Sequence, residues 1–253
     1  MMGVALVTGG TRGIGRAIAA ALVAEGMRVA VVARSRELVE KTAGELGCLG
    51  LAGDVSHPDT ARELYRQVEQ ALGPVDLLVN NAGLGGPVGP LWENDPEDWW
   101  RCMEVNLRGP MLLCREVLKS MLPRRQGRII NVASGAGAAA IPNLMAYVVS
   151  KTALLRFTEG LAMEAGLHGV RVFALHPGTV RTEMTERILL EGKESLAWFG
   201  PYMQQEEVLP EAAARMVVRL ARGEGDACVG QLISFNEELT GRPPGTYVLR
   251  LQG

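Results

Sequence analysis

The sequence predicts an α/β fold in which one parallel sheet is covered by helices on both faces. Short apolar segments alternate with longer segments of helical patterning along the chain. The short segments are nearly continuously apolar, which is typical of strands buried on both faces of a parallel sheet. No composition break or linker divides the 253 residues, so we expect one domain over residues 1–253. The pattern favours a doubly wound, three-layer arrangement with seven parallel strands.

The first half of the chain contains four of the expected strands. An apolar run at 4–8 ends in a glycine-rich turn, and an alanine-rich helix follows at about 14–25. After a second strand, Ser35 is suited to cap the helix that ends near residue 46. The remaining elements of this half are a strand at 28–33, a strand at 49–54, a helix at about 58–72 and a strand at 75–80.

The second half continues the alternation and adds two less regular segments. Residues 183–209 follow the sixth strand, and we expect a mobile substrate lid there, with plain surface packing as the alternative. Residues 236–253 form a C-terminal extension whose apolar alternation suggests an extra strand or a clasp on a neighbouring subunit. The regular elements are helices at about 96–121, 144–167 and 210–222, and strands at 128–133, 170–175 and 230–235.

Composition excludes several classes of protein. The formal net charge is −2 and 47% of the residues are hydrophobic, so disorder and general binding to nucleic acid or to an anionic membrane are not expected. No apolar run is long enough to span a membrane, and the N-terminus lacks the features of a signal peptide. The four cysteines show no CxxC spacing, so neither a metal site nor a disulfide framework is expected. We therefore expect a cytoplasmic protein.

A glycine-rich loop follows the first strand. Its glycines, Gly9, Gly13 and Gly15, have GxxxGxG spacing, and Thr11, Arg12 and Ile14 lie between them. Such a loop permits close approach of the backbone to a pyrophosphate, whose charge is met by the N–H groups at the start of the next helix. The alternative is an ordinary turn between strand and helix. The position of the glycine-rich loop after the first strand favours the binding of a dinucleotide.

The end of the second strand distinguishes between the two nicotinamide cofactors. A carboxylate at this position holds the ribose hydroxyls of NAD, but the sequence has Arg34 and Arg36 here and no acid before Glu37. A guanidinium matches a phosphate group, so Arg34, with Arg12 as a second contact, favours NADP. The alternative for Arg34 is a solvated surface arginine, and NAD(H) stays open as a cofactor.

A tyrosine and a lysine form a candidate proton-transfer pair. Tyr147 and Lys151 are four residues apart on one helix face, which places their Cβ atoms about 5–6 Å apart. A nearby ammonium lowers the pKa of a phenol, so we expect Lys151 to bring Tyr147 towards the range useful for acid–base catalysis. Ser134 follows the fifth strand and is expected to reach the same site.

These features occur in order with others: Thr8 to Gly15, Asn80-Asn81-Ala82-Gly83, Asn106, Ser134, Tyr147 with Lys151, and Pro177-Gly178. Together they resemble the short-chain dehydrogenase/reductase family in its compact form, over residues 4–235. The resemblance implies a Rossmann-type fold and hydride transfer between a nicotinamide ring and a carbonyl or alcohol. It also implies that Tyr147 exchanges the proton of the substrate oxygen, that Ser134 hydrogen-bonds this oxygen, and that Lys151 holds the nicotinamide ribose.

The resemblance further implies residues that contact the cofactor. The adenine ring is expected beside Asp54 and Val55, and its ribose beside Asn81, Ala82 and Gly83. The carboxamide is expected in the loop that contains Pro177, Gly178, Val180 and Thr182.

Asn106 belongs to the catalytic set by resemblance and has a separate physical argument. Pro110 has no N–H, so the Asn106 carbonyl loses its usual helical partner. We expect this carbonyl to bind a water that links Lys151 to solvent, and a simple helix kink is the alternative.

The leading interpretation is an oxidoreductase that prefers NADP(H) and acts on a small-molecule carbonyl or alcohol. A cofactor-binding sensor or scaffold with little turnover is the alternative, but it would not need Ser134, Tyr147, Lys151 and Asn106. A nucleic-acid-binding role has no support, because the sequence has no basic run. The resemblance also implies a homodimer or homotetramer.

Overall fold

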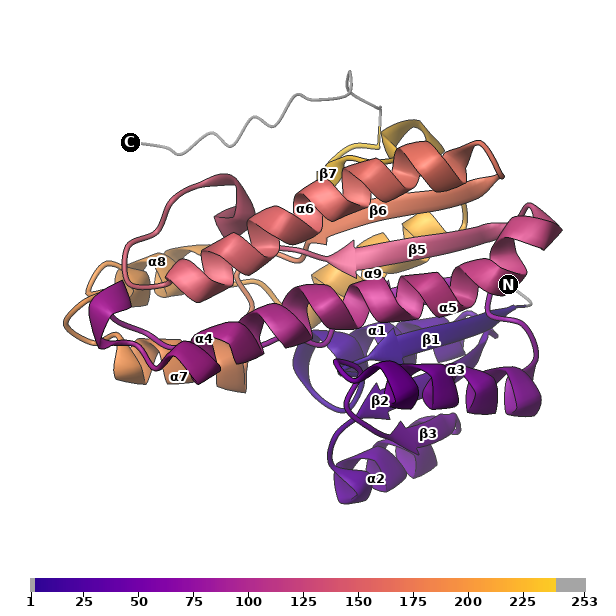
Figure 1. The fold of residues 1–253 in the computed structure, drawn as a ribbon, viewed down its shortest axis with the longest axis horizontal. Helices are drawn as coiled ribbons and strands as arrows, with labels where there is room; N and C mark the ends of the chain where they lie inside the picture. Colours follow the sequence, from indigo (N-terminus) through magenta and orange to yellow (C-terminus); the bar gives the residue numbers. More distant parts are fainter. Residues whose placement is uncertain (1–2, 240–253) are drawn as a thin grey trace.

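The computed structural model describes residues 3–239, which fold around a seven-stranded parallel sheet. The strand order is β3-β2-β1-β4-β5-β6-β7, and every neighbouring pair is parallel (Figure 1). The predicted doubly wound, three-layer fold is therefore confirmed. The strands are β1 (Val4–Thr8), β2 (Arg28–Ala33), β3 (Leu49–Ala52), β4 (Leu77–Asn80), β5 (Gly127–Val132), β6 (Val170–His176) and β7 (Leu232–Ser234).

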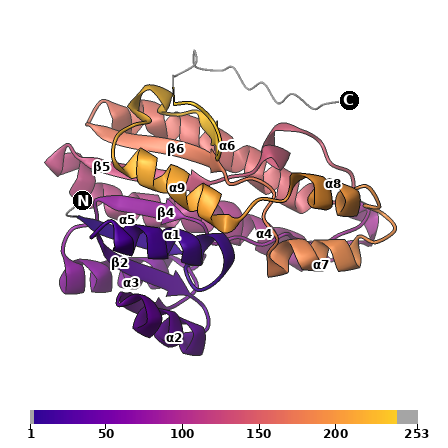
Figure 2. The same ribbon diagram turned by 180° about the vertical axis from the view of Figure 1, so that it is seen from behind.

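Helices cover both faces of this sheet. On one face, α1 packs against α9, and on the other, α3 packs against α5 beside α6 (Figures 1 and 2). The predicted cap of α2 is present, since the Ser35 hydroxyl accepts a hydrogen bond from the Leu38 N–H at 3.3 Å. The helices are α1 (Gly13–Ala24), α2 (Arg36–Leu46), α3 (Pro58–Leu72), α4 (Pro96–Met103), α5 (Gly109–Arg124), α6 (Met145–Gly166), α7 (Glu183–Glu191), α8 (Phe199–Glu206) and α9 (Pro210–Ala221).

The strands are continuously apolar because both of their faces are buried. Along β1, Val4 and Leu6 pack into the cluster formed with α3 and α5, whereas Ala5 and Val7 pack into the cluster formed with α1 and α9. Successive side chains of a strand point to opposite faces, so each face needs its own apolar set. The apolar runs that predicted the strands thus reflect the two-sided core.

The helix predicted at 96–121 is not continuous. A π-helical turn at Glu104–Arg108 separates α4 from α5, and the Gly109 N–H donates to the Glu104 carbonyl five residues earlier. The physical reason is Pro110, which lacks the N–H that an α-helix would direct to the Asn106 carbonyl. Such π-turns are frequent at functional sites, because they change the direction of nearby side chains.

The segment proposed as a lid forms α7 and α8. Both helices lie beyond the carboxyl ends of the strands, at the end of the molecule where α4 begins (Figure 1). Its C-terminal end returns to the chain that precedes it, since the Val208 N–H donates to the Thr179 carbonyl at 2.9 Å. The predicted strand or clasp in the C-terminal extension falls mainly on residues 240–253, which lie outside the described residues. Within residues 3–239, no helix has the length and apolarity needed to cross a membrane.

Two glycine substitutions test the packing of the first turn. In Gly15→Ala, the new Cβ would collide with the Gly9 carbonyl oxygen and the Asn81 amide. We expect the free energy of unfolding to fall by about 1–3 kcal/mol, as for other overpacked sites.

Gly44→Ala is the matched control, because a Cβ at this position in α2 meets nothing within 4 Å. We expect it to stabilise the protein by about 0.5–1 kcal/mol, since alanine favours a helix over glycine. Urea denaturation measures both, and equal effects of the two substitutions would contradict the packing described.

Candidate active site

Hydrogen bonds between Thr8 and Asn81 join the ends of β1 and β4. The Thr8 hydroxyl accepts from the N–H groups of Asn81 and Ala82, each at 3.0 Å. In return, the Asn81 side-chain amide donates to the carbonyls of Thr8 at 2.9 Å and Gly9 at 3.2 Å. The glycine-rich loop and the loop at Asn81–Gly83 are thereby held side by side at the carboxyl edge of the sheet.

The backbone of the glycine-rich loop adopts conformations that favour glycine. Gly9 and Gly13 have φ values of +63° and +50°, in the left-handed region. A Cβ on Gly9 would also lie 2.9 Å from the Asn81 amide nitrogen. The first turn of α1, which contains Ile14 and Gly15, receives no side-chain cap. Its N–H groups therefore suit an anion, and the loop fits the pyrophosphate of a dinucleotide.

The two arginines near this loop differ in whether they are free to contact a ligand. Arg34 is exposed after β2, and none of the described residues forms an ion pair with it within 4 Å. By contrast, Arg12 pairs with Glu183 at the start of α7, and the Thr11 carbonyl accepts a hydrogen bond from the Thr42 hydroxyl at 3.5 Å. The structure therefore leaves Arg34 open to a ligand, whereas Arg12 already has an acidic partner.

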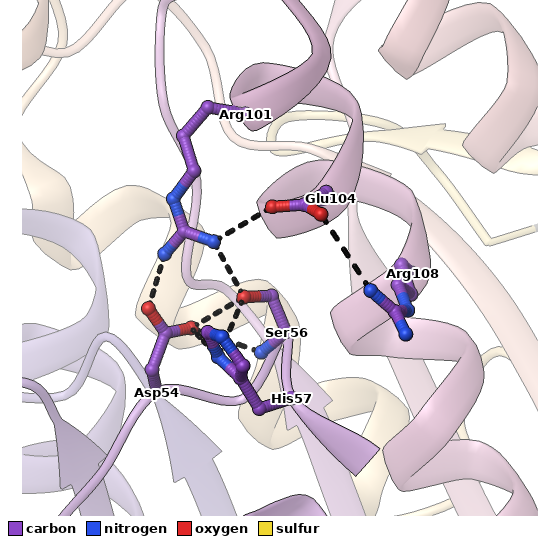
Figure 3. Close-up of polar contacts among 6 residues, drawn as sticks. All are labelled: Asp54, Ser56, His57, Arg101, Glu104 and Arg108. Atoms are coloured by element: carbon purple, nitrogen blue, oxygen red, sulfur yellow. Dashed lines mark hydrogen bonds and ion pairs between the residues drawn. The ribbon is translucent and has the colours of Figure 1, made fainter. Parts of the chain in front are cut away.

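Asp54 lies in a network of charged groups (Figure 3). Its carboxylate accepts from the N–H of Ser56 at 3.0 Å, from the Ser56 hydroxyl at 2.7 Å and from the Arg101 guanidinium. Arg101 also contacts Glu104 at 3.0 Å, and Glu104 pairs with Arg108 at 3.5 Å. The network ties the end of β3 to α4 and to the π-turn.

This network determines the charge of Asp54. Burial alone would raise the pKa of its carboxyl, but the hydrogen bonds from Ser56 and the charge of Arg101 outweigh burial and hold the pKa below its usual value. The Asp54 side chain, predicted to meet adenine, is thus bound to protein groups. Sequence reasoning missed Arg101 because no local pattern relates residues that are 47 positions apart. Next to it, Val55 is buried against Gly109.

Ser134, Tyr147 and Lys151 meet at the start of α6. The hydroxyls of Ser134 and Tyr147 are hydrogen-bond partners. The Lys151 ammonium lies 5.7 Å from the centre of the Tyr147 ring and donates to the Val132 carbonyl at 2.8 Å. Helix α6 supplies two of these groups and the end of β5 supplies the third, as the spacing predicted.

The prediction that the pKa of Tyr147 is lowered is wrong for this structure. Burial raises the pKa of its phenol, and the hydrogen bond from Ser134 opposes the rise only in part. Burial also lowers the pKa of Lys151 to about 8. The spacing indicated that the two groups are close, but it contained no information on the burial of either side chain.

The Asn106 side chain connects the loop after β4 with α6. Its carbonyl oxygen accepts from the Leu84 N–H at 2.7 Å, while its amide donates to the Leu84 carbonyl at 2.8 Å and to the Ser150 hydroxyl at 2.9 Å. Ser150 in turn donates to the Tyr147 carbonyl at 2.7 Å. Asn106 thereby positions the turn that carries Tyr147. A water relay at its main-chain carbonyl stays a prediction.

The loop after Ser134 is supported by His176. The Gly135 N–H donates to Nδ1 of His176 at 3.2 Å, and burial lowers the pKa of this imidazole. A neutral ring has the acceptor nitrogen that this bond requires. A structural hydrogen bond is therefore the role of His176 in this structure.

The loop that contains Pro177 and Gly178 turns back across the glycine-rich loop. Gly178 has a φ of +84° and Val180 is buried. Thr182 caps α7, its hydroxyl accepting from the Thr185 N–H at 3.3 Å. Its methyl carbon lies 3.2 Å from where a Cβ on Gly13 would be. The predicted cofactor segments after β1, β4 and β6 are thus in contact with one another.

A separate cavity lies at the opposite edge of the sheet. It has a volume of about 360 Å³, is lined by residues such as Asp76, Arg128 and Asp226, and contains none of the predicted site residues. Across residues 3–239, no cluster of three histidine, cysteine or acidic side chains is arranged to hold a metal ion.

Residues 3–191 match the short chain dehydrogenase family. The chain belongs to this family of nicotinamide-dependent oxidoreductases, as the motifs indicated.

Known relatives share both sequence and fold with the chain. A short chain dehydrogenase of Pseudocercospora fijiensis is 45% identical over 71% of this chain, and the match spans 60% of that protein's length. A 3beta-hydroxysteroid dehydrogenase of Mediterraneibacter gnavus is 31% identical over 93% of this chain and 94% of its own length. The crystal structure of an actinorhodin polyketide ketoreductase variant with NADPH is 34% identical, has a TM-score of 0.87, and is matched over 92% of this chain and 95% of its own.

The low pKa of Lys151 predicts a dependence of stability on pH. Between its folded value of about 8 and its ordinary value of 10.5, the unfolded chain binds the proton more tightly than the folded protein. Stability therefore rises with pH in this window, because the cost of a buried ammonium disappears.

We expect the stability of the wild-type protein relative to Lys151→Met to rise by about 1–2 kcal/mol between about pH 7 and about pH 9.5. Urea unfolding at both values measures the difference. A difference that stays constant or falls with pH would show that Lys151 is not buried as described.

Proposed function

We propose that this protein is an oxidoreductase that prefers NADP(H), interconverts a small-molecule carbonyl and its alcohol, and uses Tyr147 as the acid–base group. The observation that carries the proposal is that the Lys151 ammonium lies 5.7 Å from the centre of the Tyr147 ring, with Ser134 beside the phenol. A sensor or scaffold with little turnover is less well supported, since cofactor binding alone requires no proton donor.

The residues present fit a nicotinamide dinucleotide. Gly9, Gly13 and Gly15 would hold its pyrophosphate, because side chains at these positions would fill the loop. Further contacts would come from Asn81 to Gly83 and from the loop of Pro177, Gly178, Val180 and Thr182. When bound, the cofactor supplies or accepts the hydride, and the protein contributes orientation and the proton.

Tyr147 moves the proton in this proposal. In reduction its phenol donates the proton to the carbonyl oxygen, and in oxidation its phenolate removes the proton from the alcohol. Ser134 donates a hydrogen bond to the same oxygen. The phenol of Tyr147 is protonated near neutral pH, as the reduction of a carbonyl requires, and the hydrogen bond with Ser134 favours release of the proton.

Lys151 and Asn106 support this proton transfer. With a pKa of about 8, Lys151 carries a charge on most molecules near neutral pH, so its ammonium is available to hold the nicotinamide ribose. We assign the water relay to the main-chain carbonyl of Asn106, in the π-turn. The Asn106 side chain has a positioning role through Leu84 and Ser150.

The lid and the assembly belong to the same proposal. Residues 183–209 would cover the substrate, since Met184 and Ile188 of α7 approach the glycines of the loop after β4. The relatives named for a steroid and for a polyketide suggest a small-molecule carbonyl. The proposed cytoplasmic location rests on the sequence composition, and a homodimer or homotetramer rests on the family resemblance.

Tyr147→Phe tests the assignment of the proton donor. We expect kcat to fall by about 10²–10⁴-fold, the contribution of a general acid, whereas the Kd for NADPH stays unchanged. A panel of ketones and aldehydes with NADPH as reductant measures turnover.

Tyr65→Phe is the matched control, because Tyr65 in α3 bonds to Ser120 at 3.0 Å and lies outside the site. Full turnover by Tyr147→Phe would exclude Tyr147 as the acid.

Arg34→Gln tests the cofactor preference. An exposed guanidinium that binds a 2′-phosphate contributes about 10- to 150-fold in affinity. We therefore expect the Kd for NADPH to rise by about this factor and the Kd for NADH to stay the same, by calorimetric titration.

Arg36→Gln serves as the control, since Arg36 is exposed on the adjacent helix and faces Glu40 at 3.9 Å. An equal loss of affinity for both cofactors, or none, would contradict the role of Arg34.

A further inference from the structure

An ion pair joins the glycine-rich loop to the proposed lid. Arg12, which precedes α1, contacts the carboxylate of Glu183, the first residue of α7. The two residues are 171 positions apart, and their side chains are 58% and 66% exposed. Neither charge is buried, so the pair can exchange partners without exposing an unpaired group in the core.

Helix α7 also rests on the loops that are expected to hold the cofactor. Thr182 approaches Gly13, Met184 approaches Gly83, and the Ile188 methyl lies 3.0 Å from where a Cβ on Gly85 would be. The ion pair adds a charged contact to this packing. The start of α7 is therefore held at a position where a cofactor phosphate and the Glu183 carboxylate would compete for Arg12.

The competition follows from charge. A cofactor phosphate and the Glu183 carboxylate are both anions, and a guanidinium binds either of them with its planar N–H groups. Arg12 lies on the loop that would receive the phosphate, so the Glu183 carboxylate and the phosphate compete for its charge. Glu183 consequently lowers the apparent affinity of Arg12 for phosphate.

We propose that Glu183 is a cofactor-responsive latch: it competes with a phosphate of the nicotinamide cofactor for Arg12, and cofactor binding frees the start of α7. The inference rests on the proposed function, because it requires a cofactor on the glycine-rich loop. It adds a residue that sets cofactor affinity from the lid, and it couples occupancy of the loop to the segment that would cover the substrate.

Calorimetric titration of Glu183→Gln with NADPH and NADH tests the latch. The Kd is expected to fall by about two- to fivefold, the range that an exposed ion pair contributes. A gain with NADPH alone assigns Arg12 to the 2′-phosphate, and an equal gain with both cofactors assigns it to the pyrophosphate. Without cofactor, the amides of α7 are expected to exchange faster in this variant than in the wild-type protein.

Two further variants separate the latch from simpler effects. Glu186→Gln removes another acid from the first turn of α7 and is expected to leave the Kd unchanged. In an Arg12→Gln background, Glu183→Gln is expected to give no gain. A gain that persists without Arg12 would indicate plain repulsion of phosphate and would overturn the latch, as would an equal gain in Glu186→Gln.

The remaining outcomes distinguish a failure of the latch from a failure of the proposed function. If the wild-type protein binds cofactor but Glu183→Gln binds no more tightly, the latch is wrong and the proposed function stands. If the wild-type protein binds neither NADPH nor NADH, the proposed function fails and the latch fails with it.

Discussion

The hydrogen bonds between Thr8 and Asn81 are the constraint on which the site depends. They join β1 and β4, and the strand order reverses at this point, because β2 lies on one side and β5 on the other. Ligands of doubly wound sheets bind where the order reverses. These hydrogen bonds restrict the glycine-rich loop, in which Gly9 and Gly15 have no room for side chains beside Asn81. The other loops then assemble around this edge.

Burial governs the chemistry of the second half of the site. It raises the pKa of Tyr147 and lowers that of Lys151, so both groups are biased towards their uncharged forms. The Ser134 hydroxyl and the Val132 carbonyl supply hydrogen bonds that water would otherwise provide. Behind them, Asn106 links the loop after β4 to the same turn through Ser150. These contacts support a protonated phenol at the substrate oxygen, which is the basis of the proposed activity.

The sequence was sufficient for the fold and for the residues that local patterns reveal. The strand at 4–8 was predicted correctly, since two buried faces require a continuous apolar run. Pro110 predicted a lost hydrogen bond, but not that a π-turn would absorb it. The contacts of Asp54 with Arg101 and of Arg12 with Glu183 join distant positions, so no periodicity indicates them. The direction of the pKa shift of Tyr147 was predicted wrongly, because the spacing of residues indicates how close they are but not whether they are buried.

The central claim is that a nicotinamide cofactor binds at the carboxyl edge of the sheet, where these loops converge. Amide hydrogen exchange with and without NADPH tests it most directly. Slower exchange is predicted in residues 9–15 and 81–83, with no change at residues 125–128 beside the cavity at the opposite edge. Protection confined to that opposite cavity, or no protection anywhere on binding, would contradict the account.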